Sequence, residues 1–519
     1  MPLIASAPVS AELAAAYTRA GLWPAPPLRS AIEAIAELDG DRTALIDNDG
    51  VWTYRRLCRA VGWALGGLRR NGVAAGETVV LVAPNAALSV VAFEAILRAS
   101  AVAVMLDRRA GSLDLRYAID TTQPRLVVAP ESRVASLRES GRTARVVSLE
   151  SLVASEETPG WEEPDTSAPR VVVFTSGTTS HPKGVIHSLD TLGAGARNLA
   201  GALGFEHDDA PFLSSPLASI TGLIQTRMAL SGARIVLENE FDPAGSLARI
   251  EATRATVIGG APIIVETLFA EYERQDLRAS SLRAIALGGT MIPRTVLEVA
   301  IERFGILPTR VYGSSEVPNH TASRRDDDLG ARLADDGAPT AGSEVRVGPA
   351  PDQDELLVRG PNRFLGYLEG EDNAGAFSDG WFRTGDLVTI REGRLSVRGR
   401  LKEVVARKGL KVSLTEVDAA AADLPSVLEA SAFGVPDDET GERLALAVRP
   451  AAGVGLTFEV VIEQLLSIGL ARWKLPEQVV VWDDPLPRTA TGKVRRDELA
   501  ATADGRPTLW APRLRTTDP

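Results

Sequence analysis

The sequence is poor in the residues that build disulfides and transition-metal sites. One cysteine, Cys58, and four histidines occur in 519 residues. A single cysteine excludes an internal disulfide and argues against a cysteine-based metal site, and so few histidines make a histidine-rich site hard to assemble. Cys58 itself is interpreted as a small core hydrophobe on an amphipathic segment. Any metal is therefore expected to be a hard ion held by oxygen, which suits phosphate chemistry.

Long apolar runs and an excess of basic residues are also missing. No run of about 18 apolar residues is present to span a membrane, and the first thirty residues lack the basic start and apolar stretch of an export signal. We therefore expect a cytoplasmic protein. The formal net charge of −12 argues against nucleic acid as the main partner. The mixed-charge run 324–328, two arginines followed by three aspartates, is interpreted as a solvated loop.

Short apolar runs alternate with helical patterns through the first four fifths of the chain. This rhythm predicts α/β layers with much parallel sheet, and 519 residues exceed what one ordinary core holds. Ligands of such sheets collect at the carboxyl ends of strands, where Gly, Ser and Thr cluster here. The first strand, helix and strand are expected at 78–83, 86–99 and 101–106. Further buried strands are expected at 125–129, 170–174, 256–258, 282–287 and 309–312.

The pattern changes near residue 400. A short strand at 403–406, a turn at Gly409 and a helix with the capping box Ser413 and Glu416 are followed by strands at 427–435 and 443–449. A second helix is expected from about Phe458. This is an α+β unit of about 120 residues, a normal domain size. We predict a large multi-layer α/β N-terminal domain with mixed and parallel sheets over 1–400, and a small mobile C-terminal domain over 401–519.

The strongest local signal is VVVFTSGTTSHPKGVI at 171–186, a strand followed by a loop dense in hydroxyls and glycine with one lysine. Small residues let backbone N–H groups approach phosphate oxygens, hydroxyls donate to them, and Lys183 adds a positive charge. A triphosphate would fit such a loop, although the loop lacks the GxxxxGK[ST] pattern of a P-loop NTPase. The alternative is an ordinary surface loop.

Five motifs in the expected order resemble the adenylate-forming superfamily of acyl- and aryl-CoA synthetases, luciferases and peptide-synthetase adenylation domains. They are TSGTTSHPKG at 175–184, YGSSE at 312–316, WFRTGD at 381–386, GRLKEVVARKG at 399–409 and PRTATGKVRR at 487–496. The resemblance implies a lid-like C-terminal domain, ATP, Mg²⁺ and coenzyme A, and two half-reactions. In the first a carboxylate attacks the α-phosphate and releases pyrophosphate, and in the second a thiol attacks the acyl-AMP.

The resemblance also implies roles for individual residues. Lys493 would bridge the carboxylate and the α-phosphate, Glu316 would hold Mg²⁺, and Lys183 would serve the phosphates. Lys402 would be the hinge of the small domain and Gly409 would pass the pantetheine arm of coenzyme A. Tyr312 would lie against adenine, with Asp386 and Arg400 at the ribose. The full set of nucleotide-binding candidates is Thr175, Ser176, Gly177, Thr178, Thr179, Gly289, Thr290, Tyr312, Gly313, Ser315, Asp386 and Arg400.

The substrate can be bounded. No Asp or Glu lies between Pro211 and Leu237, the segment expected to line the acid pocket, which disfavours an amino acid that needs a counter-ion for its ammonium group. Ser219 stands where many relatives have an aromatic residue or histidine, so the gate to the pocket is less filled. The candidate lining is small or apolar and favours a hydrophobic acid. It comprises Leu217, Ala218, Ser219, Ile220, Gly288, Thr290 and Pro318.

Three functions remain in competition. The leading one is a carboxylate–CoA ligase, and the sequence most resembles medium-chain and cyclohexanecarboxylate-type ligases. The second is a stand-alone adenylating enzyme that loads a carrier protein, suggested by the segment 17–28. The third is a catalytically silent adenylate-binding protein, which the presence of Lys493, Glu316 and Asp386 disfavours. An oligomer is possible.

Overall fold

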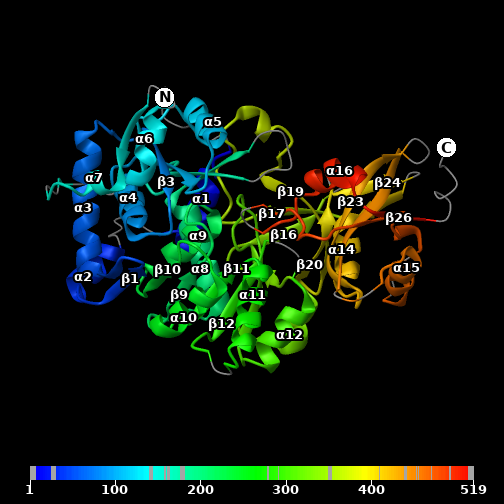
Figure 1. Cartoon of the computed structure of the whole chain (residues 1–519). Coiled ribbons are helices and arrows are strands. Elements are labelled where there is room, and N and C mark those ends of the chain that lie inside the picture. Colours follow the sequence, from blue (N-terminus) through cyan, green and yellow to red (C-terminus); the bar gives the residue numbers. More distant parts are fainter. Residues whose placement is uncertain are drawn as a thin grey trace.

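The structure is a computed structural model in which most of the chain is described. It shows a larger mixed α/β N-terminal domain and a smaller C-terminal domain, with the last strands and helices gathered at one end of the molecule (Figure 1). The described residues are 7–24, 31–139, 144–156, 159–160, 164–175, 182–277, 280–289, 292–348, 354–401, 403–407, 410–437, 441–451, 453, 455–468, 470, 472–489 and 492–511.

A nine-stranded mixed sheet forms half of the larger domain. Its order is β15-β14-β13-β12-β11-β9-β10-β1-β2, and the pairs from β13 to β1 are parallel. The carboxyl ends of these parallel strands therefore lie along one edge. The strands are β1 Thr43–Asp47, β2 Gly50–Thr53, β9 Pro211–Leu213, β10 Ile235–Leu237, β11 Val257–Gly260, β12 Ala284–Gly288, β13 Leu307–Tyr312, β14 Thr321–Ala322 and β15 Ala338–Pro339.

A six-stranded sheet forms the other half. Its order is β6-β5-β3-β4-β7-β8, parallel except for the antiparallel pair of β7 and β8. The candidate phosphate loop connects β7 to β8. The strands are β3 Thr78–Ala83, β4 Val102–Asp107, β5 Leu126–Ala129, β6 Arg145–Ser148, β7 Val171–Phe174 and β8 Gly184–His187.

Helices fill the space between the two sheets and cover their outer faces. Alternate residues of β3 separate into two cores, Val79 and Leu81 inward and Val80 and Val82 outward, because successive strand residues point to opposite faces. The inner core takes its helical residues from α2 Ala31–Leu38, α3 Tyr54–Arg70, α4 Ala87–Arg98, α7 Leu149–Leu152, α8 Leu189–Leu203 and α9 Ile220–Ala229. The outer cores use α10 Pro243–Thr253, α11 Pro262–Arg274 and α12 Arg294–Glu302 on one side, and α5 Ser112–Thr122 and α6 Glu131–Glu139 on the other.

A third, antiparallel sheet leads from these layers to the C-terminal domain. It pairs β16 with β17, β17 with β19, and β19 with both β18 and β20. Rings from Phe364, Tyr367, Phe377 and Phe382 pack together beside it. Its strands are β16 Glu344–Val347, β17 Glu355–Arg359, β18 Phe377–Ser378, β19 Trp381–Arg391 and β20 Arg394–Arg400. The smaller helices of the larger domain are α1 Ala11–Arg19, α13 Leu329–Ala334 and the 3-10 turn η1 Gly370–Asn373.

The C-terminal domain is one six-stranded sheet with a small core on each face. One face packs on α14 and α15, and the other buries Phe433 and Trp482 against α16. Its strands are β21 Val404–Arg407, β22 Leu410–Ser413, β23 Val427–Asp437, β24 Gly441–Pro450, β25 Gln478–Val481 and β26 Thr508–Trp510. Its helices are α14 Leu414–Ala422, α15 Phe458–Ser467 and α16 Arg496–Thr502, with 3-10 turns η2 Arg472–Lys474 and η3 Ala503–Gly505.

The predicted fold class is confirmed, and the predicted strands and helices fall within a few residues of those observed. The capping serine is in place, because the Ser413 hydroxyl accepts a hydrogen bond from the Glu416 backbone at 3.3 Å. The expected turn at Gly409 lies outside the described residues. The boundary expected after residue 400 falls between β20 and β21 and stays a prediction. Cys58 lies on α3 against the inner core, as expected.

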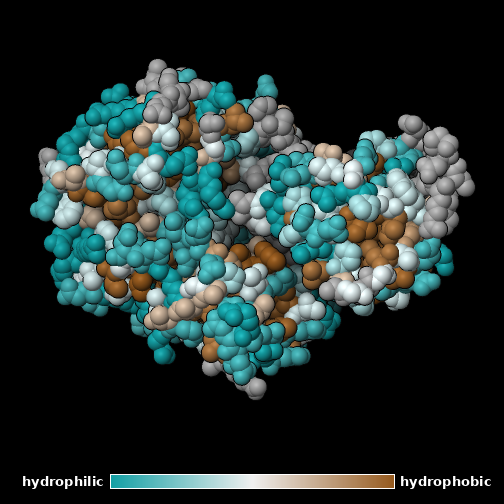
Figure 2. All heavy atoms as spheres, in the orientation of Figure 1, coloured by the Kyte–Doolittle hydropathy of each residue, from teal (hydrophilic) through white to brown (hydrophobic). Residues whose placement is uncertain are grey.

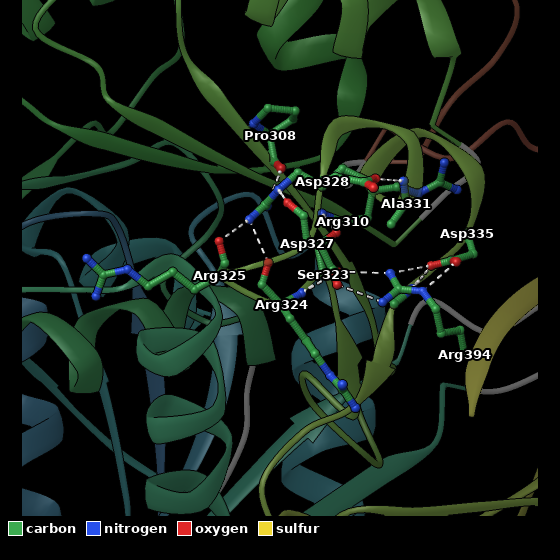
Figure 3. Close-up of polar contacts among 12 residues, drawn as sticks. Pro308, Arg310, Ser323, Arg324, Arg325, Asp327, Asp328, Ala331, Asp335 and Arg394 are labelled. Carbon is green, nitrogen blue, oxygen red and sulfur yellow. Dashed lines mark hydrogen bonds and ion pairs between the residues drawn. The ribbon is translucent and has the colours of Figure 1, made fainter. Parts of the chain in front are cut away.

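The run 324–328 is an exposed loop, as its composition predicts, with Asp327 half-buried, and it is anchored by two arginines. Arg332 is buried and donates to the backbone carbonyls of Pro308, Arg324 and Asp327, so the chain folds around its guanidinium (Figure 3). Arg394 at the start of β20 forms ion pairs with Asp327 and Asp335. Composition alone could not reveal this, because the partners of the loop come from α13 and β20.

No helix in the described part of the chain is long and apolar enough to span a bilayer. A cleft separates the two domains on the face shown in Figure 2, with apolar surface on its side over β11 and α11.

Candidate active site

The carboxyl ends of β12 and β13 form one wall of the site. Gly288, the last residue of β12, lies opposite Val311 of β13. A Cβ atom on Gly288 would be 2.3 Å from the Val311 carbonyl oxygen, so this position requires glycine. Gly289 follows with φ +79°, in the left-handed region that glycine tolerates. The backbone thus turns away from the sheet at the point where β13 presents Tyr312.

Tyr312, Asp386 and Arg400 form one hydrogen-bonded cluster. Tyr312 donates its hydroxyl to Oδ2 of Asp386 at 2.6 Å, and Nε of Arg400 donates to Oδ1 at 2.8 Å. Burial and the Asp386 carboxylate raise the pKa of Tyr312, and the same carboxylate raises the pKa of Arg400. The structure therefore brings together three of the predicted nucleotide-binding side chains, with the acid already hydrogen-bonded on both oxygens.

A second cluster contains Glu316, Lys183 and two residues that the sequence analysis did not predict. Tyr367 contacts both Glu316 and Lys183, and Asp372 contacts Lys183. Tyr367 donates its hydroxyl to Oε1 of Glu316 at 2.8 Å, and the Lys183 ammonium lies 4.6 Å from the centre of the Tyr367 ring. Nζ of Lys183 is also 3.0 Å from Oδ1 of Asp372. Burial and Glu316 raise the pKa of Tyr367, which therefore stays a hydrogen-bond donor.

The segment 365–368 reaches this cluster by pairing with β8. Leu365 N–H donates to the Ile186 carbonyl, and Leu368 N–H donates to the Gly184 carbonyl, at 2.8 and 2.7 Å. The only local signal was an aromatic residue followed by acidic residues in GYLEGED, and that signal carries no pairing partner. Tyr367 and Asp372 could not have been placed from it.

His187 anchors the backbone beside Glu316. Its Nε2 lies 2.7 Å from the Ser315 carbonyl oxygen, and its Nδ1 lies 3.0 Å from the Thr191 hydroxyl. Since a carbonyl only accepts, Nε2 carries the proton. Burial lowers the pKa of His187 to about 4, so the ring is neutral at physiological pH. No sequence pattern indicated that this histidine holds the YGSSE segment in place.

Lys493 arrives from the C-terminal domain on a tight turn. Lys493 N–H donates to the Thr489 hydroxyl at 3.2 Å, Thr489 N–H donates to the Lys493 carbonyl at 2.7 Å, and Gly492 has φ +85°. Burial and then Arg400 lower the pKa of Lys493, while Asp386, Glu403 and Glu316 act against that shift. Charged groups of both clusters therefore act on the pKa of the Lys493 ammonium, which belongs to the smaller domain.

Several predicted residues lie outside the described part of the chain: Ser176, Gly177, Thr178, Thr179, Thr290, Lys402 and Gly409. The two ends of the phosphate loop are described and lie together. Thr175 N–H donates to the Lys183 carbonyl at 3.0 Å, and Lys183 N–H donates to the Thr175 hydroxyl at 3.4 Å. The loop is therefore closed at its base, next to the second cluster.

The acid-pocket candidates divide between core and helix cap. Leu217 is fully buried, and Ala218 and Ile220 nearly so. Ser219 caps α9, because its hydroxyl donates to the Pro216 carbonyl at 2.7 Å and accepts from Gly222 N–H at 3.1 Å. A gate at Ser219 stays a prediction. That the Ser219 hydroxyl caps α9 was not predicted from the sequence.

Two unpredicted residues, Asn85 and Gly195, shape the same region. Asn85 accepts from Leu217 N–H at 2.7 Å and donates to the Ser215 carbonyl at 2.9 Å, which fixes the segment before α9. A Cβ on Gly195 of α8 would be 2.8 Å from Cδ1 of Ile224 and 3.0 Å from Cγ of Pro318. Gly195 thus allows α8, α9 and the YGSSE loop to meet, and the meeting point is apolar.

The donor set around Glu316 fits Mg²⁺ bound together with phosphates. One oxygen of Glu316 accepts from Tyr367, as described above. Among the described residues, no three His, Cys, Asp or Glu side chains gather as a complete metal cage. Mg²⁺ typically takes one or two carboxylates and completes its shell with water and substrate phosphates. Glu316 would hold the ion beside Lys183, where it would offset phosphate charge.

Comparisons with known proteins agree with this geometry. Residues 32–368 match the family described as AMP-binding enzyme, and residues 416–493 match the AMP-binding enzyme C-terminal domain. The medium-chain fatty-acid–CoA ligase of Escherichia coli K12 is 30% identical over 518 residues, which covers 93% of this chain and 91% of that protein. A feruloyl-CoA synthase from Amycolatopsis is 29% identical over 92% of this chain and 98% of its own.

Solved structures share the fold over nearly the whole chain. ATP-bound MatB from Rhodopseudomonas palustris superimposes with a TM-score of 0.83 at 24% identity, over 91% of this chain and 98% of that one. An anthranilate CoA ligase in complex with anthranoyl-AMP gives a TM-score of 0.84 at 21% identity, over 92% and 98% of the two chains. The chain therefore belongs to the AMP-binding enzyme family, as an AMP-forming acyl-CoA synthetase that works with ATP, Mg²⁺ and coenzyme A.

Proposed function

We propose that the chain is a carboxylate–CoA ligase for a hydrophobic acid of the medium-chain, alicyclic or aromatic type. The observation that carries this proposal is the location of the Lys493 turn, which packs on the first turn of α11 just after the carboxyl end of β11. Asp386 and Glu316 both act on the pKa of Lys493. The wall where α8, α9 and Pro318 meet is apolar. A hydrophobic acid would bury its body there and leave its carboxylate facing the lysine.

The first half-reaction joins the acid to AMP. A carboxylate oxygen attacks the α-phosphorus, the bond to the β-phosphate bridging oxygen breaks, and pyrophosphate leaves with that electron pair. Lys493 would offset the charge shared by the carboxylate and the α-phosphate. Lys183 and the phosphate loop would hold the outgoing phosphates, and Glu316 would hold Mg²⁺. Tyr312 would lie against adenine, while Asp386 and Arg400 would bind the ribose.

The second half-reaction transfers the acyl group. A thiolate attacks the acyl carbonyl, the carbon–oxygen bond to the phosphate breaks, and AMP leaves. For this step the small domain, 401–519, would rotate about Lys402 and pass the pantetheine arm by Gly409. Interfaces between domains of one chain commonly permit such motion. Family membership supports this two-step scheme.

The range of acids is supported by the relatives. Beside the medium-chain fatty-acid and feruloyl enzymes stands an indoleacetate–CoA ligase from Aromatoleum aromaticum, 30% identical over 90% of this chain and 96% of its own. A Mycobacterium tuberculosis ligase for a bicyclic propanoic acid is 30% identical over 91% and 97%. The acids named share an apolar body and one carboxylate, and this chain has no Asp or Glu between Pro211 and Leu237.

A screen by ATP–pyrophosphate exchange tests the proposal. Aliphatic, alicyclic, aromatic and amino acids are compared at equal concentration, and exchange is expected with hydrophobic acids and not with amino acids. With the best acid, release of AMP should require coenzyme A. Release that depends instead on a carrier protein would favour the carrier-loading enzyme, and absence of exchange with every acid would favour a silent adenylate-binding protein.

A further inference from the structure

The turn that carries Lys493 rests directly on the first turn of α11. A Cβ atom on Gly492 would lie 3.2 Å from Cγ2 of Ile263 and 3.6 Å from Cβ of Ala261. Ile263 belongs to α11, and Ala261 is its N-cap residue. This contact joins the two domains immediately before Lys493 in the chain.

Arg488 braces this turn from within the small domain. Its Nη1 donates to the Gly492 carbonyl at 2.9 Å, and its Nη2 lies 3.4 Å from Oε2 of Glu429. Arg488 and Val494 also form a β-bridge across the turn. The position of the Arg488 guanidinium is therefore coupled to that of the backbone turn that carries Lys493.

Glu266 lies one turn further along α11 than Ile263, so both residues face the small domain. Burial raises the pKa of Glu266, Arg488 opposes that rise, and Glu429 adds to it. The guanidinium thus has a carboxylate from each domain in its field. Glu429 belongs to the small domain and moves together with Arg488, whereas Glu266 belongs to the larger domain. Of these two carboxylates, therefore, only Glu266 changes its distance from Arg488 when the small domain moves.

We propose that Glu266 is a positioning residue for Lys493, whose carboxylate attracts Arg488 across the domain interface and holds the Lys493 turn on α11 during adenylation. The inference rests on the proposed function and adds to it a determinant of the adenylating arrangement. An attraction between two partly exposed opposite charges changes an equilibrium by up to about fivefold. The pair would be broken when the small domain rotates for thioester formation.

The test compares Glu266→Gln and Glu266→Lys with the control Glu273→Gln. Glu273 lies on the same helix but pairs with Arg303, the C-cap residue of α12, inside the larger domain. Acid-dependent pyrophosphate exchange is expected to fall about fivefold in Glu266→Gln and further in Glu266→Lys, while thioester formation from supplied acyl-adenylate stays within about twofold. Glu273→Gln should match the wild type in both.

A double-mutant cycle with Arg488→Gln identifies the partner. The losses caused by Glu266→Gln and Arg488→Gln should be less than additive if the two side chains act on each other. Additive losses, equal losses in both half-reactions, or identical exchange rates in Glu266→Lys and Glu273→Gln would overturn the proposal.

Amide hydrogen exchange separates this inference from the proposed function. Peptides covering 486–495 should exchange faster in Glu266→Lys than in the wild type, while α15 stays unchanged. Thermal unfolding checks that each variant is folded. If no acid supports exchange of pyrophosphate, the proposed function fails, yet the protection of 486–495 still decides the role of Glu266. Unchanged protection in Glu266→Lys would refute it.

Discussion

Asp386 and Arg400 lie directly opposite each other on β19 and β20, with Nε of Arg400 2.8 Å from Oδ1 of Asp386. The hairpin thus places a carboxylate and a guanidinium at one end of a single antiparallel ladder. Tyr312 reaches the same acid from the carboxyl end of β13. The nucleotide-binding candidates are therefore held by two different sheets at one point.

Replacing Lys493 should separate the two half-reactions. Lys493→Ala removes the ammonium that would bridge the carboxylate and the α-phosphate, so acid-dependent pyrophosphate exchange should fall by about a hundredfold or more. Thioester formation from supplied acyl-adenylate should be largely intact, because that step needs no such bridge. Arg495→Ala, an exposed neighbour, is the control. An equal loss of both half-reactions would contradict the assigned role.

The ion pair between Lys183 and Asp372 should compete with ATP. Asp372→Asn removes the carboxylate 3.0 Å from the ammonium, and a partly exposed pair is worth up to about 1 kcal/mol, so KM for ATP should fall up to about fivefold. Glu371→Gln changes an exposed acid of the same turn and should leave KM unchanged. A higher KM in Asp372→Asn would show that the carboxylate positions the lysine for phosphate instead.

Two buried histidines should make the fold sensitive to acid. Burial lowers the pKa of His187 and His320 to about 4, whereas an unfolded histidine titrates near about 6.5. The unfolded chain therefore binds more protons between these values. The free energy of unfolding should be fully present above about pH 6.5 and should decline as the pH falls toward about 4.

Urea titrations across this range measure the effect. His187→Gln should show a smaller decline than the wild type, and replacing the exposed His207 by Gln should not. If the decline in His187→Gln equals that of the wild type, protonation of this ring is not its source.

The hydrogen bonds of the Arg332 guanidinium should contribute strongly to the free energy of unfolding. Its removal leaves the carbonyls of Pro308, Arg324 and Asp327 without their donor in a buried place (Figure 3). Arg332→Met should therefore cost about 3 kcal/mol of the free energy of unfolding. Arg324→Ala removes an exposed side chain and should cost less than about 0.5 kcal/mol. Equal costs in the two variants would refute the buried network.

Local patterns were sufficient for the layers of the fold. The run 78–83 became β3 and the run 309–312 became part of β13, because a buried parallel strand needs a continuous apolar run that is visible in any short window. The five motifs were sufficient to predict that Tyr312, Asp386 and Arg400 lie together. Each of these signals is contained within a dozen or so neighbouring residues.

What local patterns could not supply are contacts between distant segments. Tyr367 meets Glu316 across 51 positions and His187 meets Ser315 across 128. Nothing in the spacing of either residue indicates its partner, because the pairing is created by sheet order. The loop 324–328 was predicted correctly, but its ion pair with Arg394 was not, since that counter-charge lies on β20.

The two ends of β20 are held by different contacts. At its start Arg394 is clamped by Asp327 and Asp335, and at its end Arg400 is followed by the proposed hinge. The strand has seven residues, so Arg394 and Arg400 are about 20 Å apart. β20 is also paired with β19 along its whole length, up to Asp386 opposite Arg400. Rotation of the small domain would therefore be confined to the chain after Arg400 and would leave the sheet behind Tyr312 undisturbed.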